Sequence, residues 1–264
     1  MLGQVKRLYG YRFFIASSIF NEFKSKFSRS RLGALWIIIN PLVQSVVYAT
    51  VLSSIIGSRL PGLSGAYAYS LYLLSGMLCW ALFQEVIMGC VNVFVDKADL
   101  MKKVSFPRAC LPIISSGVAL VNNIFLLLAI IFVFLVMGHD FAFTAFWVPV
   151  VMLVNLAFAL CVGTILGTLN VILRDVAQVV QVVLQALFWL TPIVYTVDIL
   201  PSTVRSIVEV SPIYLLVSSY QSILVYGVVP DFNKLAVLFS SCMVLALFAM
   251  ILFRRASSDI SDAL

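Results

Sequence analysis

Charged residues are scarce in this sequence. They make up 11% of its 264 residues, whereas hydrophobic residues make up 62%; ordinary soluble domains carry roughly 25% charged residues. This composition excludes a water-soluble globular domain. A spanning helix needs about 20 mostly apolar residues, because the hydrocarbon core of a bilayer is roughly 30 Å thick. The length allows several such helices and little else, which predicts an all-α integral membrane protein.

Groups that support catalysis or metal binding are also few. His139 is the only histidine, and the five cysteines lie in or beside apolar runs without Cys-x-x-Cys spacing. The acidic residues are scattered, and the sequence contains no GxxxxGK[ST] phosphate loop. We therefore expect a chain that is not an enzyme and binds no metal or cofactor. If ATP drives it, ATP and Mg²⁺ belong on another chain.

The net charge of +6 comes from Lys and Arg residues confined to short segments between apolar runs. A nucleic-acid partner would need a basic surface facing solvent, so we expect no nucleic acid. The same residues instead predict topology, because cytoplasmic loops of membrane proteins carry an excess of Lys and Arg. Fourteen of the 17 basic residues lie in residues 1–33, 96–109, 173–176 and 254–264. Both termini are therefore predicted to be cytoplasmic.

Six apolar segments are long enough to be spans. They cover residues 34–57, 69–95, 110–137, 144–172, 177–195 and 234–253. An even number of spans returns the chain to the side on which it began, in agreement with the charge pattern. The prediction is one six-helix membrane domain, residues 34–253, between a cytoplasmic segment 1–33 and a cytoplasmic tail 254–264.

Two regions outside these segments have apolar pieces of their own. Within residues 1–33, apolar residues recur at steps of three and four, which predicts an amphipathic helix on the inner leaflet. That stripe is Val5, Leu8, Tyr9, Phe13, Ala16, Phe20, Phe23 and Phe27. It is either a membrane anchor or a contact surface for a cytoplasmic partner. Residues 202–210 and 213–227 are too short to span, which predicts interfacial or re-entrant helices on the outer side.

Polar side chains within the spans are the candidates for function. Glu85 lies midway along the second span and must face the bundle interior or a wet cavity. It is a functional group, a structural hydrogen-bonding residue or a neutral, protonated acid. Gln178, Gln181 and Gln185 recur at steps of three and four, so they share one helical face that leads to Trp189. That face is either interhelical hydrogen-bonding surface, worth about 1 kcal/mol per contact, or a polar wall for a sugar-bearing substrate.

The loop from Asp96 to Arg108 is basic, and its Pro107 lies at the mouth of the third span. Topology alone accounts for its charge. An arginine such as Arg108 could also hold the phosphates of a lipid-linked substrate by paired hydrogen bonds. Tyrosines gather toward the predicted outer half, where they form an interfacial belt or face a pathway.

Seven short pieces, in a fixed order along the chain, make this sequence resemble the ABC-2 polysaccharide export permeases, the membrane subunits of O-antigen, capsule and teichoic-acid exporters. The pieces are Ser30–Trp36 (SRLGALW), Asn40–Leu42 (NPL), Tyr72–Trp80 (YLLSGMLCW), Leu100–Arg108 (LMKKVSFPR), Leu173–Gln178 (LRDVAQ), Thr191–Tyr195 (TPIVY) and Ser211–Pro212. The first residue of Thr191-Pro192 and of Ser211-Pro212 departs from the Ser-Pro and Asn-Pro that are usual there.

The resemblance implies a homodimer with two copies of a separate nucleotide-binding ATPase subunit, which moves a lipid-pyrophosphate-linked glycan outward across a bacterial inner membrane. The N-terminal amphipathic helix would be the interface helix that meets the ATPase. Residues 96–109 would form a cytoplasmic gate helix, and the short helices in 196–233 an outer gate.

Individual residues acquire expected roles from this resemblance. The expected ATPase-coupling residues are Lys24, Lys26, Arg29 and Asp175. The expected head-group and gate residues are Leu32, Gly33, Lys102, Lys103, Phe106, Pro107 and Arg108. The expected pathway residues are Glu85, Gln178, Gln181, Gln185, Trp189, Tyr195, Tyr72 and Trp80. Two other functions stay open: an ABC-2 permease for small lipids or drugs, and a polytopic membrane enzyme that acts on lipid-linked sugars without an ATPase.

Overall fold

The computed structural model describes residues 9–28, 35–36, 39, 43, 68–104, 106–136, 138 and 142–263, and over these residues the regular structure is helical. Four helices are long and apolar enough to cross a membrane, and a bent pair of shorter helices brings the number to five if it counts as one span. The all-α membrane class is therefore confirmed. Four of the six predicted spans correspond to these helices. The predicted span 34–57 falls almost wholly outside the described residues, and 177–195 corresponds to a helix of only 15 residues, so the number of six spans stays a prediction.

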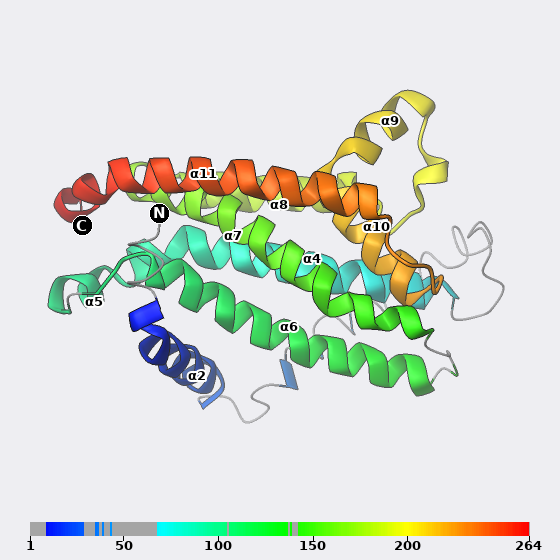
Figure 1. Ribbon diagram of the computed structural model, residues 1–264, viewed down its shortest axis with the longest axis horizontal. Helices are drawn as coiled ribbons and strands as arrows, with labels where there is room; N and C mark the ends of the chain where they lie inside the picture. The colour runs from blue at the N-terminus through cyan, green and yellow to red at the C-terminus, as the bar shows by residue number, and fades with distance from the viewer. Residues whose placement is uncertain are drawn as a thin grey trace.

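Helix α4 (Ala68–Asp96) runs through the centre of the bundle. Leu73, Leu78 and Leu82 are completely buried, because α6 (Cys110–Val136) and α7 (Val148–Ile172) pack along it (Figure 1). Small residues allow the close approach: a Cβ at Gly167 of α7 would lie 2.3 Å from the carbonyl oxygen of Cys90 in α4. These three helices form the core of the molecule.

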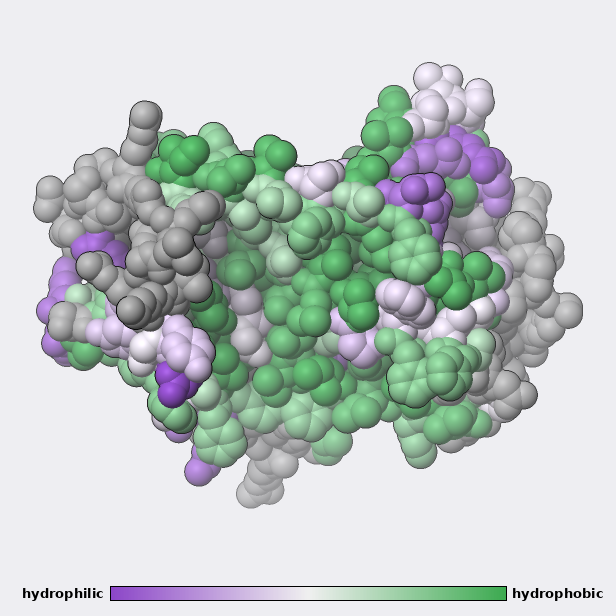
Figure 2. All heavy atoms as spheres, in the orientation of Figure 1, coloured by the Kyte–Doolittle hydropathy of each residue, from purple (hydrophilic) through white to green (hydrophobic). Residues whose placement is uncertain are grey.

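Helix α11 (Phe232–Ala263) packs on α7 and turns its other side outward. Only 17% of its most apolar stretch is buried, and Phe239, Val244 and Phe248 are exposed. Figure 2 shows the visible face as a broad hydrophobic band over the middle of the bundle, with hydrophilic residues near its two ends. Such a band is the surface that hydrocarbon would cover.

Helix α8 (Val176–Leu190) has 15 residues. It lies alongside α4 and α7 but is shorter than the predicted span 177–195, because the chain leaves the helix at Thr191-Pro192. A turn containing a short 3-10 helix, η3 (Val197–Ile199), leads to α9 (Ser202–Val210) and α10 (Pro212–Leu224). The last two helices are bent by 86° relative to one another.

A 3-10 helix, η2 (Phe143–Trp147), precedes α7 and contacts α10. Two further helices lie at the end of the bundle opposite α9 and α10 (Figure 1). Helix α2 (Arg12–Ser28) packs on α6, and α5 (Ala98–Lys103) connects α4 to the segment that leads into α6. The end of α11 is at the same side, as the charge pattern of the sequence predicts. Because the charge pattern predicts that the α2 and α5 side is cytoplasmic, we call it the cytoplasmic end and the α9 side the outer end; the orientation itself stays a prediction.

Candidate transport site

The polar face of α8 is the most unusual surface of the bundle. Gln178, Gln181 and Gln185 are exposed, as the spacing in the sequence predicts for one shared face. Within the described part of the chain, none of the three amides hydrogen-bonds to another residue. The buried side of α8 carries Val180 and Leu184, and Val179, Val182 and Val183 are exposed as well as the amides. The chain therefore leaves three amides on the surface of a helix that lies beside the central span.

Asn170 fixes the cytoplasmic end of α8. Its Nδ2 donates to the carbonyl oxygen of Val91 in α4 at 3.0 Å, and its Oδ1 accepts the backbone N–H of Ala177 at 3.0 Å. The Asn170 side chain thus satisfies an N–H in the first turn of α8, which no helical carbonyl can reach. Asp175, an expected coupling residue, lies exposed at the N-cap and makes no side-chain cap.

The turn after α8 is held to α4 and α10. The hydroxyl of Tyr69 donates to the carbonyl oxygen of Val194 at 2.8 Å. The hydroxyl of Tyr72 lies 3.3 Å from the carbonyl oxygen of Pro192 and 3.2 Å from the carbonyl oxygen of Tyr195. Gln221 of α10 also donates to Pro192, at 3.4 Å. These side chains donate hydrogen bonds to carbonyls that lie beyond the end of the helix, near Pro192. The turn therefore connects α8 to α4 and α10.

All four expected pathway aromatics have partners inside the chain, Trp189 through the ring of Phe188. Tyr72 is buried against the turn, and the buried Trp80 donates to Oε1 of Gln84 at 2.7 Å while packing on the ring of Phe188. Tyr72 and Trp80 offer almost no exposed surface, and their role as pathway residues stays a prediction. The half-buried Tyr195 donates toward the carbonyl oxygens at the end of α8, whereas Trp189 is exposed.

Glu85 lies in the contact between α4 and α6. Its Oε1 accepts a hydrogen bond from Nδ2 of Asn122 at 2.5 Å, and its side chain is half-buried. The carboxylate therefore faces the bundle interior, as the cost of a charge in hydrocarbon requires. This contact favours the structural interpretation of Glu85, and its function as a pathway residue stays a prediction.

Asparagines from α6 and α7 bind backbone carbonyls of α4, a pattern that the sequence analysis missed. Asn123 donates to Leu78 at 3.0 Å, and Asn155 donates to Cys79 at 2.9 Å. Both side chains are buried. The only signal in the sequence is asparagine within an apolar run, as the pair Asn122-Asn123 or singly as Asn155, and it does not identify the partner.

The cytoplasmic mouth is formed by α5 and the non-helical residues after it. Lys102 and Lys103 are exposed in the last turn of α5, where positive charge complements the helix dipole. Phe106 packs beside a small buried cluster made of Val93, Phe94, Leu111 and Val171. Pro107 and Arg108 are half-buried and begin the turn into α6. The predicted gate helix of 96–109 is thus one six-residue helix, Ala98–Lys103.

Helix α2 has two apolar faces. Phe14 contacts Phe106, and Phe23 stacks on Phe125 of α6, whereas Tyr9, Phe13 and Phe20 of the predicted stripe are exposed. Of the expected coupling residues, Lys24 is exposed. Arg29, Leu32 and Gly33 lie outside the described residues, and so does the side chain of Lys26.

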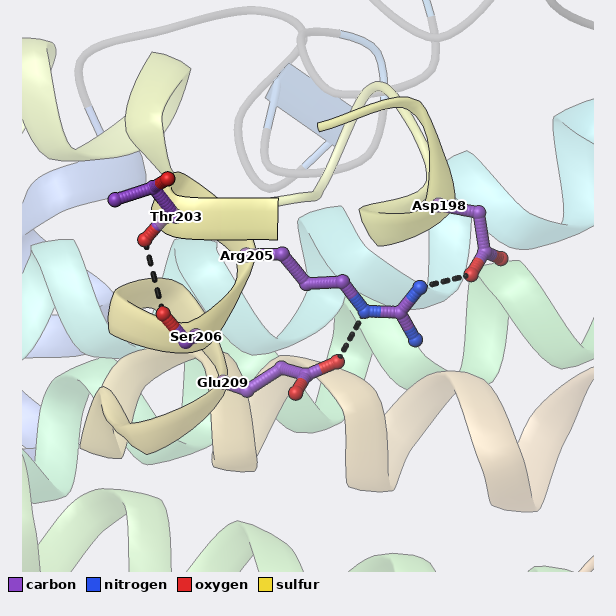
Figure 3. A network of polar contacts seen from close by, with 5 residues as sticks. All are labelled: Asp198, Thr203, Arg205, Ser206 and Glu209. Carbon is purple, nitrogen blue, oxygen red and sulfur yellow. Dashed lines mark hydrogen bonds and ion pairs between the residues drawn. The ribbon is translucent and has the colours of Figure 1, made fainter. Parts of the chain in front are cut away.

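An ion-pair network joins α9 to the turn before it at the outer end. Arg205 donates from Nε to Glu209 at 2.7 Å and from its terminal nitrogen to Asp198 at 2.9 Å (Figure 3). The carboxylate of Asp198 also adds to the effect of burial in raising the pKa of Tyr226, just beyond α10. The sequence analysis did not predict these partners of Arg205.

A bundle of long hydrophobic helices defines a polytopic membrane protein. The exposed amides of α8 are its candidate transport surface. The chain belongs to the ABC-2 type transporter family, because the model of that family matches residues 15–225.

Relatives align over nearly the whole chain. An O-antigen export system permease protein RfbA of Myxococcus xanthus is 29% identical over 272 residues and covers 100% of both chains. Two proteins of the same name from Klebsiella pneumoniae are 24% and 25% identical over 251 residues and cover 93% of each chain. The recognition of the export-permease family from its sequence pieces is therefore confirmed.

Proposed function

We propose that this chain is the transmembrane permease subunit of an ABC exporter that moves a lipid-linked, O-antigen-like polysaccharide from the cytoplasm outward across a bacterial inner membrane. The relatives' names support the class of cargo, and their alignment over nearly the whole chain supports one function for the whole length. A separate ATPase subunit supplies the energy, as membership of the family implies.

The exposed amide face of α8 carries the proposal. Transfer of an unpaired polar group from water into hydrocarbon costs on the order of several kcal/mol. Gln178, Gln181 and Gln185 therefore belong beside a second copy of the chain or beside a wet pathway. A homodimer with this face turned inward provides both environments. Trp189, at the outer end of the same helix, adds a flat ring for sugar C–H groups.

The two ends of the bundle take complementary roles in this proposal. At the cytoplasmic mouth, Lys102, Lys103 and Arg108 lie in the segment that the lipid pyrophosphate would meet first, and cationic donors bind phosphate strongly. At the outer end, the bent α9–α10 pair lies beside the exit. ATP binding by the partner subunits would move the cytoplasmic end.

The test is a deletion strain complemented with the full chain, examined for surface glycan and for lipid-linked glycan retained inside the cell. Loss of surface glycan with internal accumulation, restored by complementation, supports export. Unchanged surface glycan would contradict the proposed cargo. Co-purification from the native membrane provides the second readout, because a permease subunit should bring an ATPase with it, whereas a membrane enzyme should be active alone.

A further inference from the structure

One polar side chain interrupts the burial of the central helix α4. Between Tyr69 and Phe94, where the structure describes every residue, Gln84 alone is exposed. Its neighbour Phe83 is buried and stacks on a ring of α7, and its other neighbour, Glu85, is half-buried and contacts α6. Gln84 therefore lies on a side of α4 that α6 and α7 leave open.

The indole of Trp80 fixes the orientation of the Gln84 amide. Nε1 of Trp80 donates to Oε1 of Gln84 at 2.7 Å, one helical turn away. An indole nitrogen can only donate a hydrogen bond, so the amide atom that faces it must be the oxygen. The indole itself is buried and packs on the ring of Phe188 in α8. The amide nitrogen of Gln84 is thus turned away from Trp80, and within the described part of the chain neither of its N–H groups donates.

Two contacts place Gln84 at the level of the exposed amides of α8. Val91 of α4 is linked to the start of α8 through one side chain, and Trp80 meets Phe188 near the end of α8, so the two helices run antiparallel. Gln84 lies one turn from Trp80 toward Val91. Because both helices rise about 1.5 Å per residue, its level on α8 is about four residues before Phe188. That level falls within the amide face.

We propose that Gln84 is a further substrate-binding residue of the transport surface, an amide on α4 that donates hydrogen bonds to hydroxyl and ring oxygens of the passing glycan. Trp80 is a positioning residue, because it determines which end of the amide faces outward. This inference rests on the proposed function, in which the amide face of α8 lines a wet pathway. An amide held in this orientation presents donors alone, so it selects acceptor oxygens, which every sugar of a glycan carries.

The competing interpretation is structural. In that case Gln84 serves only to accept the N–H of the buried indole, and only its oxygen matters. The two interpretations differ in what they require of the outward end of the side chain, because a carboxylate can accept from Trp80 but has no N–H to offer a substrate.

Two substitutions at Gln84 separate these interpretations in the complete transporter. Gln84→Glu keeps an acceptor for the indole and removes the outward donors, whereas Gln84→Leu removes both. Each variant should lower glycan export per folded molecule by about fivefold, the size of effect expected for one lost hydrogen bond, while membrane abundance is retained. Export by Gln84→Glu equal to wild type would overturn the binding role, and so would Gln84→Leu if it lost thermal stability but kept export per folded molecule.

A double-mutant cycle tests the positioning role of Trp80. Trp80→Phe keeps an aromatic ring against Phe188 but removes the N–H, which frees the amide to turn. Export per folded molecule should fall by about twofold in this variant, since the donors then face outward only part of the time. In a Gln84→Leu background the same substitution should have no further effect, because residues that act through one contact are not additive. An equal fall in both backgrounds would contradict the positioning role.

Thiol labelling tests the water access of the site without measuring export. Gln84→Cys should react in native membranes with a water-soluble maleimide, because the reactive thiolate is favoured only where water reaches the sulfur. Leu128→Cys is the matched control, since Leu128 is 56% exposed on the apolar surface of α6 and should face lipid. Both are compared with the wild-type chain, whose own cysteines give the background. Labelling of Gln84→Cys no greater than that of Leu128→Cys would overturn the proposed site.

The two proposals fail in different ways. If the wild-type chain restores no surface glycan to the deletion strain, the proposed function is wrong. If wild type exports glycan and both Gln84 variants export equally well, only the binding role of Gln84 is wrong.

Discussion

Helices α4 and α8 both carry polar side chains among apolar ones, but they satisfy them differently. On α4, Tyr69 and Tyr72 bind carbonyls of the turn after α8, and Ser75 bonds back to Leu71 within the helix. On α8, the side-chain amides of Gln181 and Gln185 are exposed and make no hydrogen bond within the described part of the chain.

This difference separates two uses of polarity in a membrane protein. A polar group that finds its partner inside the chain stabilises the fold, because leaving it unpaired in hydrocarbon is costly. A polar group that the chain leaves uncovered indicates a contact with something outside it. Substitutions in the two helices should accordingly affect different measurements: stability for the α4 contacts and export for the α8 face.

The largest effect on stability is expected at the contact between α4 and α7. In Gly167→Ala the new methyl group would lie 2.3 Å from the carbonyl oxygen of Cys90, a backbone atom that cannot rotate away. Overpacking of this kind costs about 1–3 kcal/mol, so thermal unfolding of the purified protein should begin at a clearly lower temperature. Gly89→Ala is the control, because it meets the rotatable hydroxyl of Ser115. Equal stability of the two variants would contradict this packing.

The α8 face should show the opposite behaviour. Gln181→Leu combined with Gln185→Leu removes two amides that the chain itself does not use, so membrane abundance and thermal stability should be unchanged. Export of glycan should fall by about tenfold, which corresponds to about 1.4 kcal/mol in the barrier. The Asn variants at the same positions keep the amide and should retain more export. A loss of stability instead of export would place these side chains among the structural contacts.

A smaller loss of stability is expected from Asn155→Leu. The substitution removes the hydrogen bond to the carbonyl oxygen of Cys79 while roughly preserving volume. Polar contacts between membrane helices contribute on the order of 1 kcal/mol or less, so thermal unfolding should shift slightly downward and export per folded molecule should be kept. Export lost at full abundance would move Asn155 from the structural group to the functional one.

The smallest effect is expected at the outer end. Arg205→Ala removes the link among Asp198, Arg205 and Glu209, but solvent-exposed ion pairs contribute little. Thermal unfolding should be unchanged, and limited proteolysis between residues 198 and 210 should quicken by about twofold. Arg205→Lys keeps the charge but cannot donate to both carboxylates from separate nitrogens. Its proteolysis rate should lie between those of wild type and Arg205→Ala. A large fall in thermal stability would show that the network supports the whole bundle.

Most span positions could be predicted from hydrophobic length. The predicted segments 69–95, 110–137, 144–172 and 234–253 correspond to candidate spans Tyr69–Asp96, Cys110–Leu135, Phe143–Ile172 and Phe232–Leu252. The predicted piece 202–210 coincides with α9, because Pro201 and Pro212 bound it. The segment 177–195 was too long by the turn after Leu190, since its residues are apolar although a proline ends the helix.

Periodicity also predicted that Gln178, Gln181 and Gln185 share a face. It could not predict long-range partners such as Asn155 with Cys79 or Asn170 with Val91, because spacing along one helix carries no information about its neighbours. The same limit applies to α2. Its predicted stripe is largely exposed at Tyr9, Phe13 and Phe20, whereas the neighbouring face, with Phe14 and Ile19, packs on the bundle.

The asparagines that bind carbonyls of α4 constrain how the molecule can move. Donors from α6 and α7 engage Leu78 and Cys79, and Asn170 engages Val91, 12 residues beyond Cys79. At about 1.5 Å per residue, these attachments are about 18 Å apart along the helix axis. Rotation of α4 about its own axis, or sliding along it, would break all of them together. We therefore expect the three core helices to move as one rigid unit, and the conformational changes of transport to occur in the elements around them.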